Sequence, residues 1–374
     1  MVRNRLLAGL LLLTAVQCTP APPAGARAKI ITQKRELIGG PHALGDLGDY
    51  LLENTDVRFI LQQPGFSRGF GVFGGGLIDA DIQRPIPPGD ENGARGMDNF
   101  AEAFPAFFLV AMEPREIRLN RERKAAMEIL PDAGDGSASI IVRGRPNQFL
   151  ALTETINNAL VSPEFLLFET TYKLPATGRT LEITTRVYNE GNEVATFKNK
   201  QFTGSVSLDV PFGDVLLFGA GNRVFAPGDG GFDLRYRLQQ RYKENIQLPA
   251  LPGLVVDYLA TQGDDVSYGF FLPTDVPPPA QGDSHPNFVM DHAALYGSKA
   301  RPGSILVPFI ASAFTGVFHT QGPNRLAPGE VFEFRRYFSV GNGDVASITQ
   351  EVYRVRNQAH GTLAGRVVDS VTQS

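Results

Sequence analysis

Histidines and carboxylates are the residues here that could exchange protons with a substrate. The sequence has five His, at positions 42, 285, 292, 319 and 360. His319 ends an apolar run that we expect to be a strand, and general acid–base chemistry would require a carboxylate beside it in the fold. No Asp or Glu occurs between Asp291 and Glu330. His319 is therefore a candidate ligand-binding residue, or an acid/base only with a distant carboxylate. We assign no catalytic residue.

Two further groups contain residue types that ligate metals. Residues 283–292 carry two Asp and two His, but in a Pro-rich loop with a spacing that matches no common site. Asp79 and Asp81 follow three glycines and could bind calcium through carboxylate oxygens, although a capped strand end explains them equally well. The interpretation is that there is no metal site and no cofactor.

Aromatic side chains offer a different chemistry, because sugar sites favour an exposed aromatic platform beside Asn, Asp or Arg. Tyr242, Tyr258 and Tyr268 lie near turns or polar residues and are the candidate ligand-binding aromatics. The sequence has 26 Phe, most of which we expect in the core, and no Trp, the strongest sugar platform.

Composition narrows the class of protein. A formal net charge of −4 gives no basic field for nucleic acid, and a single Cys excludes an internal disulfide framework. With 40 Gly and 27 Pro among 374 residues, the chain has more turn-forming residues than a helical bundle.

The first residues indicate export. Arg3 and Arg5 precede an apolar run over 6–16 that is too short to span a bilayer, which is typical of a signal peptide. Cys18 follows, so residues 1–18 resemble the signal peptide of a bacterial lipoprotein, with 19–34 as a Pro/Ala/Gly tether. The residue after the cysteine is Thr19 rather than the Asp that is associated with retention in the inner membrane, so we expect the outer membrane. Plain secretion, with cleavage after Ala28, is the alternative.

From residue 29 the dominant hydrophobic period is two, which predicts strands. We expect strand pairs over 49–65, 164–189 and 253–273, and further strands near 71–79, 138–143, 201–208, 214–219, 305–319 and 331–339. Short helices are expected at 94–103 and 344–355, the second with Asp344 as N-cap. Short strands with Gly/Pro turns favour an all-β fold, a large antiparallel sandwich.

Two segments carry a family resemblance. The hairpin EFLLFETTYKLPATGRTLEITTRVYNEGN (164–192) and RLAPGEVFEFRRYFSVG (325–341) resemble the galactose-mutarotase-like β-supersandwich, over roughly residues 35–357. Similar domains precede a carboxypeptidase-regulatory-like module and a PHP-type metallohydrolase domain in some bacterial lipoproteins. GTLAGRVVD in the tail resembles the first strand of such a regulatory-like module, so 358–374 would be its truncated start.

The resemblance implies a mid-chain His and a late-strand Glu as the acid and base of a mutarotase, and the sequence has neither where they would fall. The interpretation is a non-catalytic binding or scaffold module of an exported lipoprotein, with a glycan or cell-surface ligand as partner and a membrane contact through the lipid only. The alternatives are a carbohydrate-active enzyme of the epimerase or lyase type, and an accessory domain of a metallohydrolase beyond Ser374.

The export signal gives the first testable prediction: in a bacterial host, Cys18 carries lipid. Mass spectrometry of the mature protein should find an acylated N-terminal Cys18. A mature N-terminus at Lys29, with Cys18 removed, would show the lipoprotein interpretation to be wrong.

Overall fold

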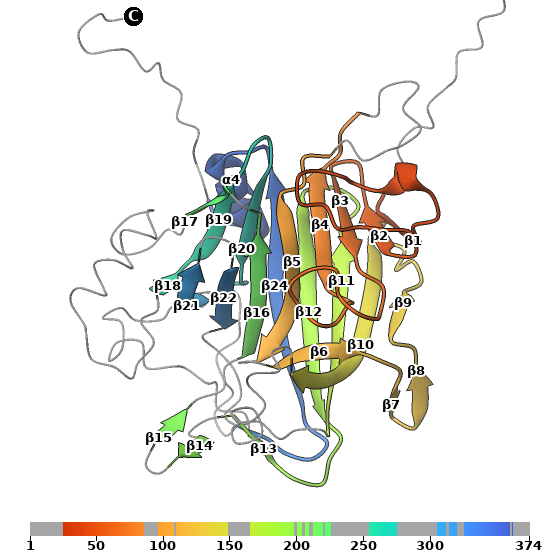
Figure 1. The fold of residues 1–374 in the computed structure, drawn as a ribbon, viewed down its shortest axis with the longest axis vertical. Coiled ribbons are helices and arrows are strands. Elements are labelled where there is room, and N and C mark those ends of the chain that lie inside the picture. Colours follow the sequence, from red (N-terminus) through yellow and green to blue (C-terminus); the bar gives the residue numbers. More distant parts are fainter. Residues whose placement is uncertain are drawn as a thin grey trace, which may run out of the picture.

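The structure is a computed structural model that describes residues 25–85, 96–107, 110–148, 165–197, 200–203, 206–208, 212–219, 221–225, 254–274, 305–311, 314–319, 325–359 and 361. The fold is all-β and antiparallel, as the sequence predicts, and 18 strands belong to one hydrogen-bonded network. Figure 1 shows most strands standing side by side along the long axis, with the α-helix at one end.

The strand pairings trace two layers of a sandwich. The first layer runs, in spatial order, through β1 (Arg27–Ile30), β2 (Tyr50–Glu53), β3 (Val57–Leu61), β4 (Leu77–Ile82), β5 (Phe100–Phe107), β16 (Phe212–Phe218), β22 (Phe314–His319), β21 (Ile305–Ala311) and β18 (Leu254–Val256). The second runs through β10 (Ala138–Gln148), β11 (Leu166–Leu174), β12 (Thr180–Asn189), β24 (Val331–Gly341), β20 (Ser267–Phe271), β19 (Tyr258–Gln262) and β17 (Arg223–Phe225).

Shorter elements complete the chain. β6 (Val110–Pro114) pairs with both β5 and β10 and so joins the two layers, and β9 (Met127–Ile129) pairs with β10. The remaining elements are β7 (Ile117–Leu119), β8 (Glu122–Lys124), β13 (Ala195–Thr196), β14 (Lys200–Thr203), β15 (Val206–Leu208), β23 (Arg325–Leu326), the 3-10 helix η1 (Lys34–Glu36) and the helix α4 (Val345–Val355).

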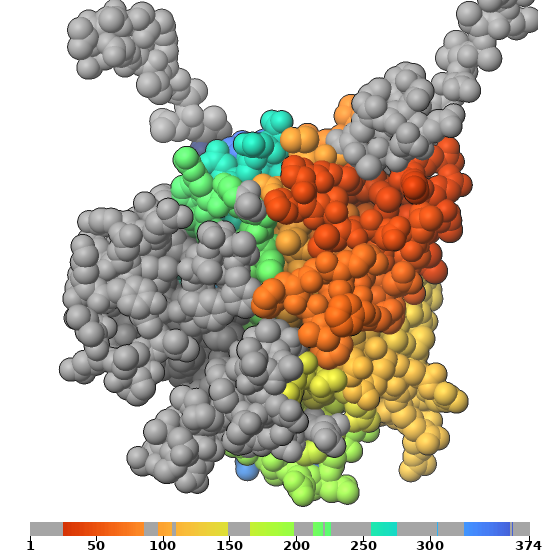
Figure 2. Space-filling view, in the orientation of Figure 1, coloured from red at the N-terminus to blue at the C-terminus, as the bar shows by residue number. Residues whose placement is uncertain are grey.

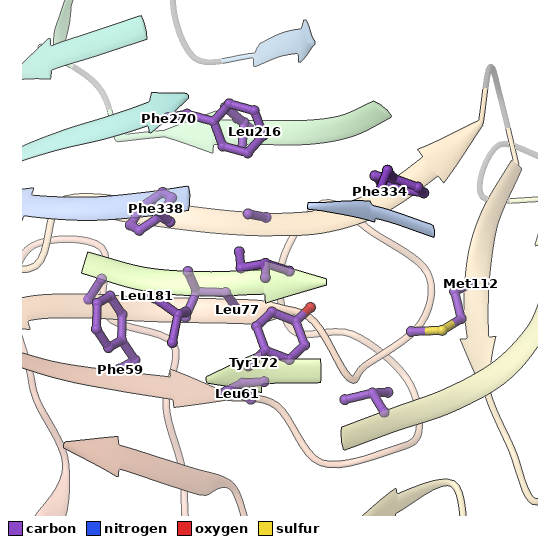
Figure 3. Close-up of a cluster of buried hydrophobic side chains, with 14 of the residues drawn as sticks. Phe59, Leu61, Leu77, Met112, Tyr172, Leu181, Leu216, Phe270, Phe334 and Phe338 are labelled. Carbon is purple, nitrogen blue, oxygen red and sulfur yellow. The ribbon is translucent and has the colours of Figure 1, made fainter. Parts of the chain in front are cut away.

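The core lies between the layers and is rich in phenylalanine. Phe338 of β24 meets Phe100 of β5 with ring centroids 4.9 Å apart, and Phe59 of β3 at 6.4 Å. Figure 3 shows Leu181 and Phe270 from the second layer facing the same interior. The alternation along each strand therefore sends every second side chain into one shared core.

Several sequence predictions are confirmed by these elements. The pairs of strands at 49–65 and 164–189 are the hairpins β2–β3 and β11–β12, and the 253–273 segment forms β18, β19 and β20. The predicted late helix is α4, and Asp344 caps it by accepting a hydrogen bond from the Ser347 backbone N–H at 2.6 Å. Ile348 and Val352 bury its apolar stripe.

Three expectations were wrong. The helix predicted near 94–103 is absent from 96–103, where β5 begins at Phe100, because alternate side chains such as Phe100 enter the core while β16 supplies the backbone partners. The strand expected at 71–79 begins only at Leu77, after a glycine-rich loop. Residues 27–30, placed in the tether, form β1 through pairing with β2.

Other expectations fall outside the described residues: Cys18, Tyr242, the 283–292 cluster, and residues 362–374 of the tail. Within the described part of the chain, no helix combines the length and the apolar character that crossing a bilayer requires.

The hairpin β11–β12 supplies a prediction for the core. Ile183 is 3% exposed and faces the core, whereas Thr184 points to the other face and is half-buried. Ile183→Ala should lower the free energy of unfolding by about 2–5 kcal/mol, because it removes buried apolar surface and leaves a cavity. Thr184→Ala, the control, should change it little. Chemical denaturation measures both, and two harmless substitutions would contradict the placement of this strand.

Candidate functional site

The candidate site is a loop over residues 62–76, called here the aromatic loop, which connects β3 to β4. It folds back on itself through backbone hydrogen bonds, from Gly74 N–H to the Gly65 carbonyl at 2.8 Å and from Ser67 N–H to the Val72 carbonyl at 3.0 Å. Its Val72 and Phe73 pack on an apolar cluster on the outer side of β5 and β16. The loop is thus a folded part of the surface rather than a loose connection.

A buried carboxylate fixes the tip of this loop. Glu102 of β5 is 1% exposed and accepts hydrogen bonds from the Ser67 hydroxyl at 2.7 Å and the Gly71 N–H at 2.6 Å. Burial raises the pKa of Glu102, and these hydrogen bonds oppose the rise. A Cβ on Gly69 would lie 2.6 Å from a Glu102 oxygen, so the close approach requires glycine there.

An ion pair fixes the other side of the loop. Arg68 pairs with the buried carboxylate of Asp49, and its Nε donates to the Leu44 carbonyl at 2.8 Å. Asp49 also accepts from the Gln63 N–H at 3.0 Å. The turn at residues 46–49 is therefore tied to the aromatic loop by one arginine and one aspartate.

The residues that lead into this turn are held by a second carboxylate. Asp79 of β4 accepts from the backbone N–H groups of Leu44 at 2.7 Å and Gly45 at 3.0 Å. Burial is the main cause that raises the pKa of Asp79 from its ordinary 3.8 to about 6, and the charge of Asp49 adds to the rise. Two carboxylates and one arginine thus position the segment next to the loop.

Held in this way, the loop presents aromatic side chains to solvent. Phe66 is 82% exposed and Phe70 45% exposed, and Leu47 of the adjoining turn is 42% exposed. Figure 2 shows the orange surface around this part of the chain facing the viewer, beside the red N-terminal surface. Apolar surface displayed on a rigid loop is suited to contact with a partner.

The residues predicted for ligand binding lie elsewhere. Tyr258 and Tyr268 are buried, and the Tyr258 hydroxyl is 2.7 Å from the Thr349 hydroxyl of α4. Neither ring is exposed as a sugar platform would need to be, because both face the interior of the packed elements. His319 ends β22, where it pairs with Ile305 across to β21. Their role in ligand binding stays a prediction.

The alternative of a calcium site at Asp79 and Asp81 is not favoured by the contacts. Asp79 is occupied by the backbone of the 44–45 turn, while Asp81 pairs with Arg84 at 2.7 Å and accepts from the Met97 N–H. The oxygens of both carboxylates are therefore already engaged by donors of the protein rather than turned toward a shared ion. Among the described residues, no three His, Cys, Asp or Glu side chains are grouped to hold a metal.

A second charged cluster lies wholly in the core. Arg336 of β24 is 0% exposed; its Nη2 lies 2.7 Å from Asp214 Oδ1 on β16, and its Nη1 donates to the Thr185 hydroxyl at 2.6 Å. Because Asp214 and Arg336 stand on opposite layers, the pair ties the layers together. Its enclosure makes it a structural contact rather than a place that a substrate reaches.

We compared the structure of this chain with solved structures of other proteins. Solved structures similar to this chain include the Slr1438 protein from Synechocystis sp. PCC 6803, at 11% identity and TM-score 0.39, covering 80% of this chain and 98% of the other. A putative aldose 1-epimerase from Escherichia coli K12 has 11% identity and TM-score 0.36, with 78% and 98% covered. A galactose mutarotase-like protein from Clostridium acetobutylicum has 10% identity and TM-score 0.34, with 79% and 95% covered.

At such identities and TM-scores, these likenesses carry no argument about the family, the activity or the ligand of this chain. No family model matches the sequence, and no curated protein matches it.

The aromatic loop escaped the sequence interpretation. Its signal was Phe66 and Phe70 set among Pro64 and several glycines, where a core phenylalanine is unexpected. Exposure itself depends on Glu102 and Asp49, which contact the loop from other segments of the chain and belong to no local sequence pattern.

Asp79 gives a prediction of pH dependence. Its pKa is raised on folding, so its contribution to the free energy of unfolding is fully present below about pH 4 and is lost as the pH rises through about 6. Between pH 4.5 and 7.5, wild type should therefore lose more stability than Asp79→Asn. Urea denaturation at both pH values measures this. Glu116→Gln, on the surface, should behave like wild type, and equal pH slopes for Asp79→Asn and wild type would contradict the assignment.

Proposed function

We propose that this chain is a non-catalytic binding module of an exported lipoprotein, and that the aromatic loop binds carbohydrate. The observation that carries the proposal is Phe66, which is 82% exposed on a loop held in place by buried groups. Export and lipid attachment rest on the segment around Cys18. An accessory role beside a further catalytic domain is compatible with such a module.

Exposure of Phe66 has a cost that a ligand would remove. A fully buried phenylalanine gains roughly 1.5–3 kcal/mol relative to an exposed one. The apolar face of a sugar ring can cover an aromatic ring of this kind, as can another apolar surface. Phe66 and Phe70 on one loop provide two such contact points.

The hydrogen bonds that hold the loop in place also support a role in binding a ligand. Glu102 and Gln62 fix its backbone, and the Gln62 amide donates to the Phe66 carbonyl at 2.8 Å. Because the loop is ordered on folding, little conformational entropy remains to be lost on association.

Polar groups on the same loop and on the adjoining turn suit the hydroxyl groups of a sugar. Gln63 and Asp46 are exposed, and the Arg68 side chain is 31% exposed beside Asp49. The Gln63 amide packs against the 46–49 turn, with its oxygen 3.0 Å from where a Cβ on Gly48 would stand. Amide, carboxylate and guanidinium groups beside apolar rings are the combination typical of small-molecule sites.

The proposal predicts retention on polysaccharide that depends on Phe66. Affinity electrophoresis through gels containing β-glucan, galactan, xylan or mannan should retard the purified wild-type protein on at least one of them. Phe66→Ala should weaken that retention at least tenfold, the effect expected of a central aromatic contact, with the melting temperature unchanged because the ring is exposed.

Tyr353→Ala is the matched control, since Tyr353 is an exposed aromatic on α4, away from the loop. The proposal fails if no polysaccharide retards wild type, or if Phe66→Ala is retarded as strongly as wild type. Self-association of wild type that Phe66→Ala abolishes, without retention on any polysaccharide, would assign the loop to contacts between copies instead.

A further inference from the structure

The hairpin formed by β7 and β8 stands apart from the long strands, near β9 (Figure 1), and it concentrates positive charge. Residues 113–124 contain five Arg and Lys side chains and three Glu, in a chain whose formal net charge is −4. We call this segment, residues 113–124, the basic hairpin. Because its charge is opposite in sign to that of the whole protein, attraction of an anion to it would be a local property of this segment.

The base of the basic hairpin is fixed by Arg143 of β10. The Arg115 N–H donates to the Arg143 carbonyl at 3.1 Å, and the Arg143 N–H donates to the Ala126 carbonyl at 2.7 Å. Ile117 and Leu119 are buried in an apolar cluster with β11. The hairpin is therefore held at both of its ends and along one face, and alternation along the strands turns its other face to solvent.

Two arginines stand directly opposite each other on the solvent face. Arg118 of β7 is the partner of Arg123 of β8 in the antiparallel register, and both are exposed. Like charges at directly opposed positions destabilise a pair of strands. Arg123 pairs with Glu116 at 2.6 Å, whereas the nearest acceptor of Arg118 among the described residues is the Arg121 carbonyl, 3.5 Å from its Nε. Positive charge thus stands where folding alone would favour the opposite sign.

The turn between the two strands has a second unfavourable feature. Asn120 and Arg121 both have a left-handed backbone, with φ of 52° and 69°. A two-residue hairpin turn with positive φ at both central positions is usually formed by Asn followed by Gly. Asn120 follows that preference, whereas the Cβ of Arg121 is strained in the left-handed region. Arg121 therefore stands where glycine would give a more stable hairpin.

The pairing of charges within the basic hairpin indicates which ligand it lacks. Three of its cations each pair with a carboxylate of the same segment: Arg115 with Glu113, Arg123 with Glu116, and Lys124 with Glu122. Arg118 and Arg121 have no carboxylate partner in the described part of the chain. The planar guanidinium group offers parallel N–H donors that match the two oxygens of a carboxylate. We propose that Arg118 and Arg121 bind carboxylates of an acidic polysaccharide of the polyuronate class.

A polymer fits the basic hairpin better than a membrane surface does. Segments that bind anionic membranes combine positive charge with apolar side chains that enter the bilayer. The apolar residues of this hairpin, Ile117 and Leu119, are buried against the protein instead. A polyuronate carries a carboxylate on each sugar, so neighbouring sugars can meet two guanidinium groups of one hairpin. The site lies outside the aromatic loop, so the inference does not depend on the sugar contact proposed for Phe66.

The test measures retention of the whole purified chain in gels that contain polygalacturonate, with its highly methyl-esterified form in parallel gels. Wild type should bind the acid form about tenfold more tightly than the ester, because esterification removes the charge and keeps the sugar chain. The preference should shrink as NaCl is raised from about 50 to about 500 mM, since salt screens contacts between exposed charges.

Two substitutions remove the guanidinium groups without touching the core. Arg118→Gln and Arg121→Gly should weaken binding to polygalacturonate by about threefold each and by about tenfold together. Neither should lower the melting temperature, because the first removes a repulsion between facing arginines and the second relieves the strained turn. Arg35→Gln is the matched control, since it removes the same charge from an exposed arginine on η1, and it should bind as wild type does.

The inference is overturned if wild type shows no preference for the acid form, or if the double variant is retained as strongly as wild type. Binding of wild type to phosphatidylglycerol vesicles that the double variant loses, without retention by polygalacturonate, would also overturn it and assign the hairpin to a membrane surface. The same comparison in the Phe66→Ala background removes retention through the aromatic loop. Disappearance of the acid preference in that background would place the acidic polymer on the aromatic loop, which overturns this inference while the proposed function stands.

Discussion

Charge and polarity enclosed between two β-layers must be matched by neighbouring groups, because water is not there to solvate them. Arg336 meets this constraint completely: it stands in the core between β24 and β16 and is paired with Asp214 and Thr185. Removing one partner of such a pair would leave a buried charge, at a cost of roughly 3–5 kcal/mol. The phenylalanine core can close around an arginine only because the opposite layer provides its carboxylate.

The same constraint explains how a surface loop becomes rigid. Glu102 lies on the outer side of the first layer, where it is covered by residues 67–71 and would be unpaired without them. The loop therefore does two things together: it satisfies a buried carboxylate and, in wrapping around it, turns Phe66 outward. The same contacts hold the loop in place and expose Phe66, so a binding role is better supported here than at Tyr258 and Tyr268, whose rings are buried.

The parts of the fold that could be predicted from the sequence are those in which apolar residues recur at a regular spacing within one strand or helix. The alternation in 179–189 and the capped stripe of 344–355 are β12 and α4, because each pattern is decided within one element. The helix expected at 94–103 was wrong since pairing with β16, more than a hundred residues away, overrides the local preference. The aromatic loop was missed for the same reason: what exposes Phe66 is Glu102, and no spacing rule connects the two.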